Sequence, residues 1–359
     1  MRLVQLKQPS LLGMTLEEMK TFFLEMGEKP FRAAQAYRAI YKHRILKFEQ
    51  ITEFSLALRS QLSCKATIER MQIDKVYHSI DGTRRYLFRL GDGLEIESVW
   101  IPEPDRATIC ISSQVGCPLA CEFCLTGLIG VKRNLSAGEI VGQVLLVLAD
   151  IFGHQPADRQ INIVMMGMGE PLLNYENSLK AIRLLSDEAG VSISTRHITL
   201  STAGIVPRIY DLGREQVRPK LAISLTGARD ELRNRLMPIN RKYPLAELLQ
   251  ACRDFPLKAR ERITFEYVML DGVTDSDTDA RLLVKLLSGI RAKVNLIPHN
   301  PAEELPFQPS SDKQILRFQQ ILTDHGLSAF IRRPRGRDIF AACGQLAVKA
   351  LNEPALVHH

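Results

Sequence analysis

The stretch CPLACEFC places Cys117, Cys121 and Cys124 within eight positions. So tight a group of thiols in a cytosolic chain is more often a metal site than core packing. Structural zinc usually draws on two paired knuckles, and here there is no second cysteine pair and no nearby histidine. A bacterial ferredoxin run would need a further regularly placed cysteine. The spacing therefore favours a four-iron, four-sulfur cluster in which one iron stays open to a small chelating molecule.

Composition limits the classes of protein to which the chain can belong. The 359 residues are 45% hydrophobic, enough for one large domain and a smaller one. There is no run of about 18 apolar residues, and the N-terminus lacks the features of a signal peptide. We therefore expect a cytoplasmic protein whose seven cysteines are ligands, catalytic thiols or core residues. The net charge of +7 permits a polyanionic partner but does not require one.

Four segments are expected around the cysteine loop. Residues 1–64 read as helices and form either an RNA-binding domain or a solvated helical one. Residues 65–104 alternate short strands with Asp-Gly turns, which predicts a β-meander linker. Residues 105–335 alternate strands with amphipathic helices, and residues 336–359 are expected to form a C-terminal loop and helix. The fold class is therefore α/β, a partial (β/α) barrel with an N-terminal helical domain and a small β-meander.

The barrel strands should carry the reactive groups at their carboxyl ends. The cysteine loop follows the first expected strand directly, so it should lie at the barrel mouth. Two helices are predicted to open with capping boxes, at Thr15 with Glu18 and at Ser136 with Glu139. The expected strands are 107–113, 161–167, 196–202, 220–226, 262–270, 293–300 and 328–334.

The cysteine loop, with Phe123 before its last cysteine, resembles the radical S-adenosylmethionine superfamily. The resemblance implies that the methionine end of S-adenosylmethionine chelates the open iron, and that one electron then cleaves the sulfonium to a 5′-deoxyadenosyl radical. Further matches cover nearly the whole chain and resemble the bacterial dual-specificity ribosomal-RNA and transfer-RNA adenine-C2 methyltransferases, usually named RlmN. The related carbon-8 methylase Cfr shares most of these motifs and remains the alternative. The matching stretches are SSQVGCPLACEFCLTG, MMGMGEPLLN, LSTAGIVP, RNRLMPINRKYPL and RGRDIFAACGQLA.

Two further cysteines gain roles only through this resemblance. Carbon 2 of adenine is electron-poor and cannot attack a sulfonium methyl as an amine would, so the cofactor must supply a radical route. The family implies that Cys343 is methylated by one of two S-adenosylmethionines and then bonds to the base. It implies that Cys110 afterwards attacks Cys343, forms a disulfide and releases the methylated base. Without the resemblance, Cys343 is a helix-packing thiol and Cys110 a buried strand residue.

The resemblance also implies a general base and a cofactor site. Glu97 stands at the position of the base, and Glu95 is the competing carboxylate on the same strand face. Thr226 departs from the family, which usually has His there, so an imidazole contact is lost although a backbone contact can survive. The implied cofactor-binding residues are Gly169, Glu170, Ser201, Ser224, Leu225, Thr226 and Asn300.

The implied partners are 23S ribosomal RNA, transfer RNA and a reducing electron donor of the flavodoxin type, without a membrane. We expect a monomer. A basic stretch before Cys343 is either a phosphate-contacting loop or a merely solvated one. Cys64 and Cys252 lie in helical patterns and are expected to be core thiols. The arginines of the basic stretch are Arg332, Arg333, Arg335 and Arg337.

Overall fold

The computed structural model describes residues 8–68 and 71–347, and its main feature there is one large sheet. The strand order is β1-β2-β3-β4-β7-β8-β9-β10-β11-β12. From β4 onward all neighbouring strands in this order are parallel, which confirms the predicted α/β partial barrel. Within the described residues β1 and β12 do not pair with each other, so the barrel is open. The parallel strands are β4 (Arg106–Cys110), β7 (Gln160–Met165), β8 (Ile198–Thr202), β9 (Lys220–Ser224), β10 (Ile263–Met269), β11 (Ala292–Pro298) and β12 (Ala329–Ile331).

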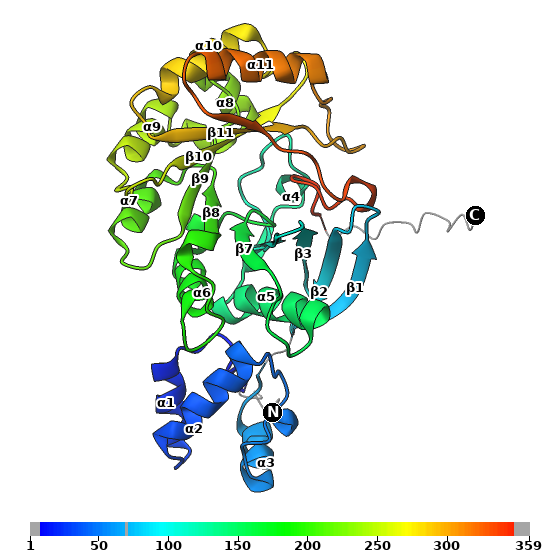
Figure 1. The fold of residues 1–359 in the computed structure, drawn as a ribbon, viewed down its shortest axis with the longest axis vertical. Helices are drawn as coiled ribbons and strands as arrows, with labels where there is room; N and C mark the ends of the chain where they lie inside the picture. Colours follow the sequence, from blue (N-terminus) through cyan, green and yellow to red (C-terminus); the bar gives the residue numbers. More distant parts are fainter. Residues whose placement is uncertain (1–7, 69–70, 348–359) are drawn as a thin grey trace, which may run out of the picture.

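Helices between the parallel strands cover the outer face of the barrel (Figure 1). The predicted capping box of Ser136 and Glu139 opens the first of them, because the Ser side chain and the Glu side chain each bond the other's backbone N–H. These bonds satisfy donors that a helix start otherwise leaves unpaired. The helices are α5 (Ala137–Phe152), α6 (Tyr175–Ser186), α7 (Val206–Arg214), α8 (Asp230–Leu236), α9 (Leu245–Asp254), α10 (Asp277–Leu287) and α11 (Asp312–Asp324).

The β-meander is an extension of the barrel sheet. Its strands are β1 (Gln72–His78), β2 (Arg84–Arg89) and β3 (Glu95–Pro102). Strand β3 pairs antiparallel with β4, and Val99 stands opposite Cys110. The meander thus carries its own residues, Glu97 among them, to the first barrel strand.

The N-terminal helices dock against α5 and α6 at the end of the molecule that lies lowest in Figure 1. The Tyr37 hydroxyl donates a 2.6 Å hydrogen bond to Asp187 next to α6. At Gly13 a Cβ atom would come within 2.6 Å of the Gly138 backbone, so only glycine permits this approach. The helices are α1 (Leu16–Glu25), which begins with the predicted capping box of Thr15 and Glu18, α2 (Pro30–Tyr37) and α3 (Leu56–Lys65).

Two smaller predictions had different outcomes. Cys252 is buried, as expected. Cys64 is exposed, so its assignment to the core was wrong, because its position falls on the solvent side of the short helix α3. None of the helices that the structure describes is both long and apolar enough to cross a membrane.

Candidate active site

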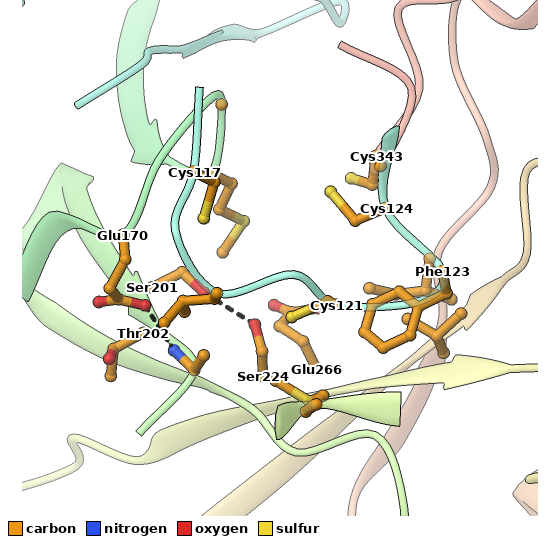
Figure 2. Close-up of a pocket in the computed structure, with 18 of the residues that line it drawn as sticks. Cys117, Cys121, Phe123, Cys124, Glu170, Ser201, Thr202, Ser224, Glu266 and Cys343 are labelled. Atoms are coloured by element: carbon orange, nitrogen blue, oxygen red, sulfur yellow. Dashed lines mark hydrogen bonds between the residues drawn. The ribbon is translucent and has the colours of Figure 1, made fainter. Parts of the chain in front are cut away.

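A pocket opens at the barrel mouth, and most of the predicted site residues line it. Figure 2 shows the cysteine loop on one side and the ends of the parallel strands on the other. The lining includes the predicted residues Cys117, Cys121, Cys124, Gly169, Glu170, Ser201, Ser224, Asn300 and Cys343.

A short hairpin holds the cysteine loop at its base. Strands β5 (Gln114–Gly116) and β6 (Val131–Asn134), which the sequence patterns did not reveal, pair antiparallel and leave the cysteines on the excursion between them. Gly116 has a φ of +78°, and a Cβ there would lie 1.8 Å from the Gly130 carbonyl oxygen. The hairpin therefore closes only with glycine at this position.

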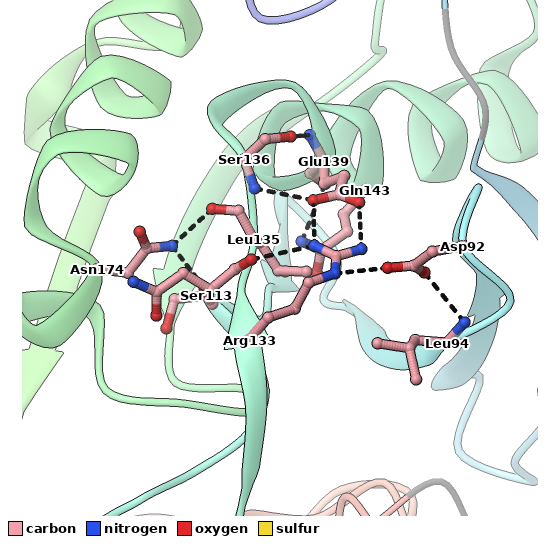
Figure 3. Close-up of polar contacts among 10 residues, drawn as sticks. Asp92, Leu94, Ser113, Arg133, Leu135, Ser136, Glu139, Gln143 and Asn174 are labelled. Atoms are coloured by element: carbon pink, nitrogen blue, oxygen red, sulfur yellow. Dashed lines mark hydrogen bonds and ion pairs between the residues drawn. The ribbon is translucent and has the colours of Figure 1, made fainter. Parts of the chain in front are cut away.

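Arg133 ties this hairpin to two other elements, as Figure 3 shows. Its guanidinium donates to both carboxylate oxygens of Glu139, at 2.8 and 2.7 Å, and Glu139 also caps helix α5. Its Nε donates at 2.6 Å to Asp92 in the turn between β2 and β3. The base of the cysteine loop is thus fixed to the helix start and to the meander.

The three loop cysteines line the wall of the pocket together. In the part of the chain that the structure describes, no three His, Cys, Asp or Glu side chains are grouped as the ligands of one metal ion. The thiols nevertheless interact: burial first, then the neighbouring Cys124 and Cys117, raise the pKa of Cys121 well above its usual value. Burial raises the pKa of Cys117 to about 12. Three thiols on one loop at the wall of a pocket are the kind of donors that hold an iron–sulfur cluster.

Glu170 is a buried carboxylate at the edge of the pocket. Its oxygens accept hydrogen bonds from the backbone N–H groups of Leu172 and Ala203, at 3.0 and 2.8 Å. Its own N–H donates to Gln114 at 2.8 Å, which links it to the hairpin under the cysteines. Burial raises the pKa of Glu170 to about 7, and the two N–H donors oppose that rise. The Glu170 carboxyl group therefore ionises near neutral pH and can then pair with a positively charged group of a ligand.

The other predicted cofactor residues divide into two groups. Ser201 and Ser224 line the pocket with their hydroxyl oxygens 3.5 Å apart. Asn300 lines it too and donates at 3.2 Å to the carbonyl oxygen of Cys343. Leu225 and Thr226 are fully buried and do not line the pocket. The assignment of these residues to the cofactor remains a prediction.

Thr226 uses its side chain within the sheet. Its hydroxyl accepts a hydrogen bond of 3.4 Å from the N–H of Val268 on β10. The Leu225 N–H donates to the carbonyl oxygen of Glu266 at 2.9 Å. Both residues therefore connect the end of β9 to β10.

Cys343 lies within electrostatic reach of Cys110 although 232 residues separate them in the chain. A charge on Cys343 acts on Cys110, and with burial, the larger effect, it raises the pKa of Cys110 to about 12. Protein atoms surround the Cys343 thiol, which raises its pKa, yet the open pocket leaves the residue accessible to water. The positive charge of Arg332 opposes this rise in the pKa of both thiols. Figure 2 shows Cys343 beside Cys124.

Glu97 is buried in an ion pair with Arg85. Both side chains are 1% exposed, and Arg85 Nη1 lies 2.8 Å from Glu97 Oε1. The Tyr77 ring packs 4.2 Å from the guanidinium carbon. Glu97 does not line the pocket, whereas Glu95 is partly exposed and lies 3.7 Å from Arg89. The two competing carboxylates thus occupy very different surroundings.

The C-terminal segment, residues 336–347, follows β12 and runs towards the meander (Figure 1), and its residues Cys343 and Gly344 line the pocket. The Leu125 N–H donates to the Gly344 carbonyl oxygen at 2.8 Å, and the Ser79 hydroxyl donates to Asp338 at 2.6 Å. Arg337 donates to Asn300 at 3.1 Å. Within the described residues this segment holds only a short 3₁₀ turn, Arg337–Ile339, and the rest of the predicted C-terminal helix falls outside them.

Three polar residues at the pocket had no role in the sequence patterns. Glu266 and His299 line it, and both are buried. Arg233 lies beneath it, fully buried, and donates to the carbonyl oxygens of Leu225 and Ala203 at 2.7 Å each. Arg233 belongs to the RNRLMPIN stretch, so its motif was visible, but only the fold shows that it holds the ends of β8 and β9.

Comparison with known families agrees with this fold. Residues 111–283 match the radical SAM superfamily, and residues 10–68 match the ribosomal RNA large subunit methyltransferase N-terminal domain. The structure superposes with a TM-score of 0.91 and 42% identity on the crystal structure of a radical SAM methyltransferase from Sphaerobacter thermophilus. That match covers 94% of this chain and 99% of the other. The molecule is thus a radical SAM methyltransferase by class.

Two similar proteins narrow the family to which the chain belongs. The chain is 50% identical over 345 residues to the dual-specificity RNA methyltransferase RlmN of Syntrophotalea carbinolica. The aligned residues cover 96% of this chain and 91% of that protein. The chain is 49% identical over 355 residues to the dual-specificity RNA methyltransferase RlmN of Rhodospirillum rubrum. This alignment covers 97% of this chain and 82% of that protein. The chain belongs to the RlmN family of dual-specificity RNA methyltransferases, which confirms the resemblance seen in the sequence.

Proposed function

We propose that this enzyme methylates carbon 2 of adenosine in 23S ribosomal RNA and in transfer RNA, with Cys343 as the methyl carrier. The position of Cys343 is the observation that carries the proposal. The C-terminal segment returns to the barrel mouth and sets this thiol in the wall of the pocket lined by Cys117, Cys121 and Cys124. A thiol at this place can receive a methyl group from a pocket ligand and offer it to a base.

The three loop cysteines would hold a four-iron cluster, and Gly169, Glu170, Ser201, Ser224 and Asn300 would bind S-adenosylmethionine. When bound, these groups supply the one-electron cleavage of a sulfonium bond that an unreactive carbon requires. Gly169 has a φ of +103°, and a Cβ there would lie 2.6 Å from the Cβ of Gln114, so only glycine lets this turn pack against the hairpin under the cysteines. Glu170 can accept hydrogen bonds from an ammonium group.

Cys343 and Cys110 would act in sequence. The Cys343 thiolate bonds to the methyl carbon of one S-adenosylmethionine, and S-adenosylhomocysteine leaves with the electron pair. A hydrogen atom of the S-methyl group would pass to the 5′ carbon of a second, cleaved S-adenosylmethionine, and the remaining methylene carbon would bond to carbon 2 of the base. Glu97 would take the carbon-2 proton, and the odd electron would return to the cluster. The Cys110 thiolate would then bond to the Cys343 sulfur while the carbon–sulfur bond breaks, and the released carbon would take up a proton to complete the methyl group. A reductant, which we expect to be of the flavodoxin type, must supply electrons to the cluster, and the disulfide must be reduced before the next turnover.

Nucleoside mass spectrometry of RNA tests this function directly. Cells that carry the gene for this protein should contain 2-methyladenosine in 23S ribosomal RNA and transfer RNA, and cells that lack it should not. The same cells with Cys343→Ala should lose the modified nucleoside. Detection of 8-methyladenosine instead would favour the carbon-8 alternative.

A further inference from the structure

Glu266 places a buried carboxyl group on the floor of the active-site pocket, and none of the roles above uses it. The residue is 7% exposed and lines the pocket from the middle of β10. Figure 2 shows it beside Ser224 and facing the side of the cysteine loop. A carboxyl group in such a place costs free energy unless hydrogen-bond donors satisfy it.

Strand register explains which polar groups meet at this point. Glu266 stands opposite Ser224 on β9 and opposite Asn295 on β11. Asn295 Nδ2 donates to Glu266 Oε1 at 2.9 Å and so fixes the orientation of the carboxyl group. Ser224 in turn faces Ser201 on β8. The four side chains form a polar row across neighbouring parallel strands.

The second carboxyl oxygen of Glu266 remains available to a ligand. Among residues 8–68 and 71–347, no group donates a hydrogen bond to Oε2 and no cation lies within ion-pair distance of it. The charge of Arg332 acts on Glu266 from farther away and opposes the effect of burial. The protein itself therefore satisfies only one side of this group.

We propose that Glu266 is a specificity-determining residue that accepts a hydrogen bond from a ribose hydroxyl of the nucleoside bound in the pocket. In dinucleotide-binding folds an acidic side chain of the parallel-sheet domain accepts a hydrogen bond from a ribose hydroxyl. A hydroxyl suits this place because it donates to Oε2 and also accepts from the serines next to it. The proposal rests on the proposed function, which brings two riboses to the site, one in S-adenosylmethionine and one in the RNA adenosine.

The cofactor ribose can be tested by binding alone. The binding of S-adenosylhomocysteine to cluster-reconstituted enzyme is compared with that of its 2′-deoxy and 3′-deoxy analogues. The analogue that lacks the hydroxyl contacted by Glu266 should bind about tenfold more weakly. In Glu266→Ala this preference should fall to about one. Because no methylation is measured, this assay gives an answer even if the proposed RNA product is wrong.

The RNA ribose is tested by kinetics. A substrate with a single 2′-deoxyadenosine at the target position should lower kcat/KM of the unchanged enzyme about tenfold if Glu266 contacts that ribose. The loss should then be absent in Glu266→Ala. Loss of discrimination in either assay supports the proposal and identifies the ribose, whereas equal discrimination by enzyme and variant in both assays overturns it.

Two variants separate recognition from folding. Glu266→Gln keeps the size of the side chain and an oxygen for Asn295, and it should reduce the preference at least threefold. If Glu266→Ala binds no iron, the binding preference of Glu266→Gln tests the proposal instead. Glu261→Gln changes a glutamate just before the opposite end of β10, and this control should leave both preferences unchanged.

Discussion

The backbone N–H of Ala347 donates a hydrogen bond of 3.0 Å to Glu97 Oε2, while Arg85 holds the other oxygen of the same carboxylate at 2.8 Å. Both oxygens of the proposed base are therefore engaged. The segment that carries Cys343 thus also contacts the carboxylate of Glu97.

Glu97→Gln should slow the last steps of methylation and weaken the fold. Gln cannot accept the carbon-2 proton, so a covalent protein–RNA species should accumulate and product formation should fall about 100-fold or more. The variant also leaves the charge of Arg85 buried without its counter-charge, which should cost about 3 kcal/mol of unfolding free energy. Denaturing gels and chemical unfolding measure the two effects. Glu95→Gln is the matched control, and the same accumulation in that variant would move the base to Glu95.

Cys110→Ala and Cys343→Ala should fail at different stages. Without Cys110, Cys343 becomes linked to RNA through the methylene carbon, but the carbon–sulfur bond is not broken. Protein crosslinked to RNA should therefore accumulate. Without Cys343 no crosslink and no methylated RNA should form, while iron content stays normal. Free methylated RNA at the normal rate from Cys110→Ala would remove that thiol from the mechanism.

Arg133→Ala should loosen the base of the cysteine loop. The substitution removes the paired bonds to Glu139 and the bond to Asp92, which are half-exposed and together contribute about 1–2 kcal/mol. We expect severalfold less iron per chain under limiting iron, measured by metal analysis. Arg159→Ala removes a similarly half-exposed arginine that pairs with the adjacent Asp158, away from the cysteine loop, and its iron content should match that of the unchanged protein.

Glu170 should make the stability of the cluster-free protein depend on pH. Its carboxyl group has a pKa of about 7 in the folded protein and 4.5 as its ordinary value. Between these values the folded state binds more protons than the unfolded state, so stability falls as pH rises from about 4.5 to 7. The loss approaches about 3 kcal/mol. Denaturant unfolding at pH 5 and pH 8 measures it, and Glu170→Gln should remove this part of the pH dependence. An unchanged slope in that variant would contradict the assignment.

The sequence by itself determined the elements and the class of chemistry. Capping boxes at Thr15 and Ser136 marked helix starts correctly, because the bonds that cap a helix join residues three positions apart. The barrel strands were predictable because parallel strands buried on both faces are continuous apolar runs. The three loop cysteines stood within eight residues, so their proximity needed no knowledge of the fold.

Tertiary structure alone decided which distant residues share the site. The pairing of Ser224, Glu266 and Asn295 depends on strand register, and the approach of Cys343 to Cys110 depends on the path of the C-terminal segment. The burial of Glu97 against Arg85 likewise follows from packing, since alternation along β3 places Glu95 on the same face in a partly exposed position. Contacts between residues far apart in the chain leave no local pattern, and they appear only once the sheet is assembled.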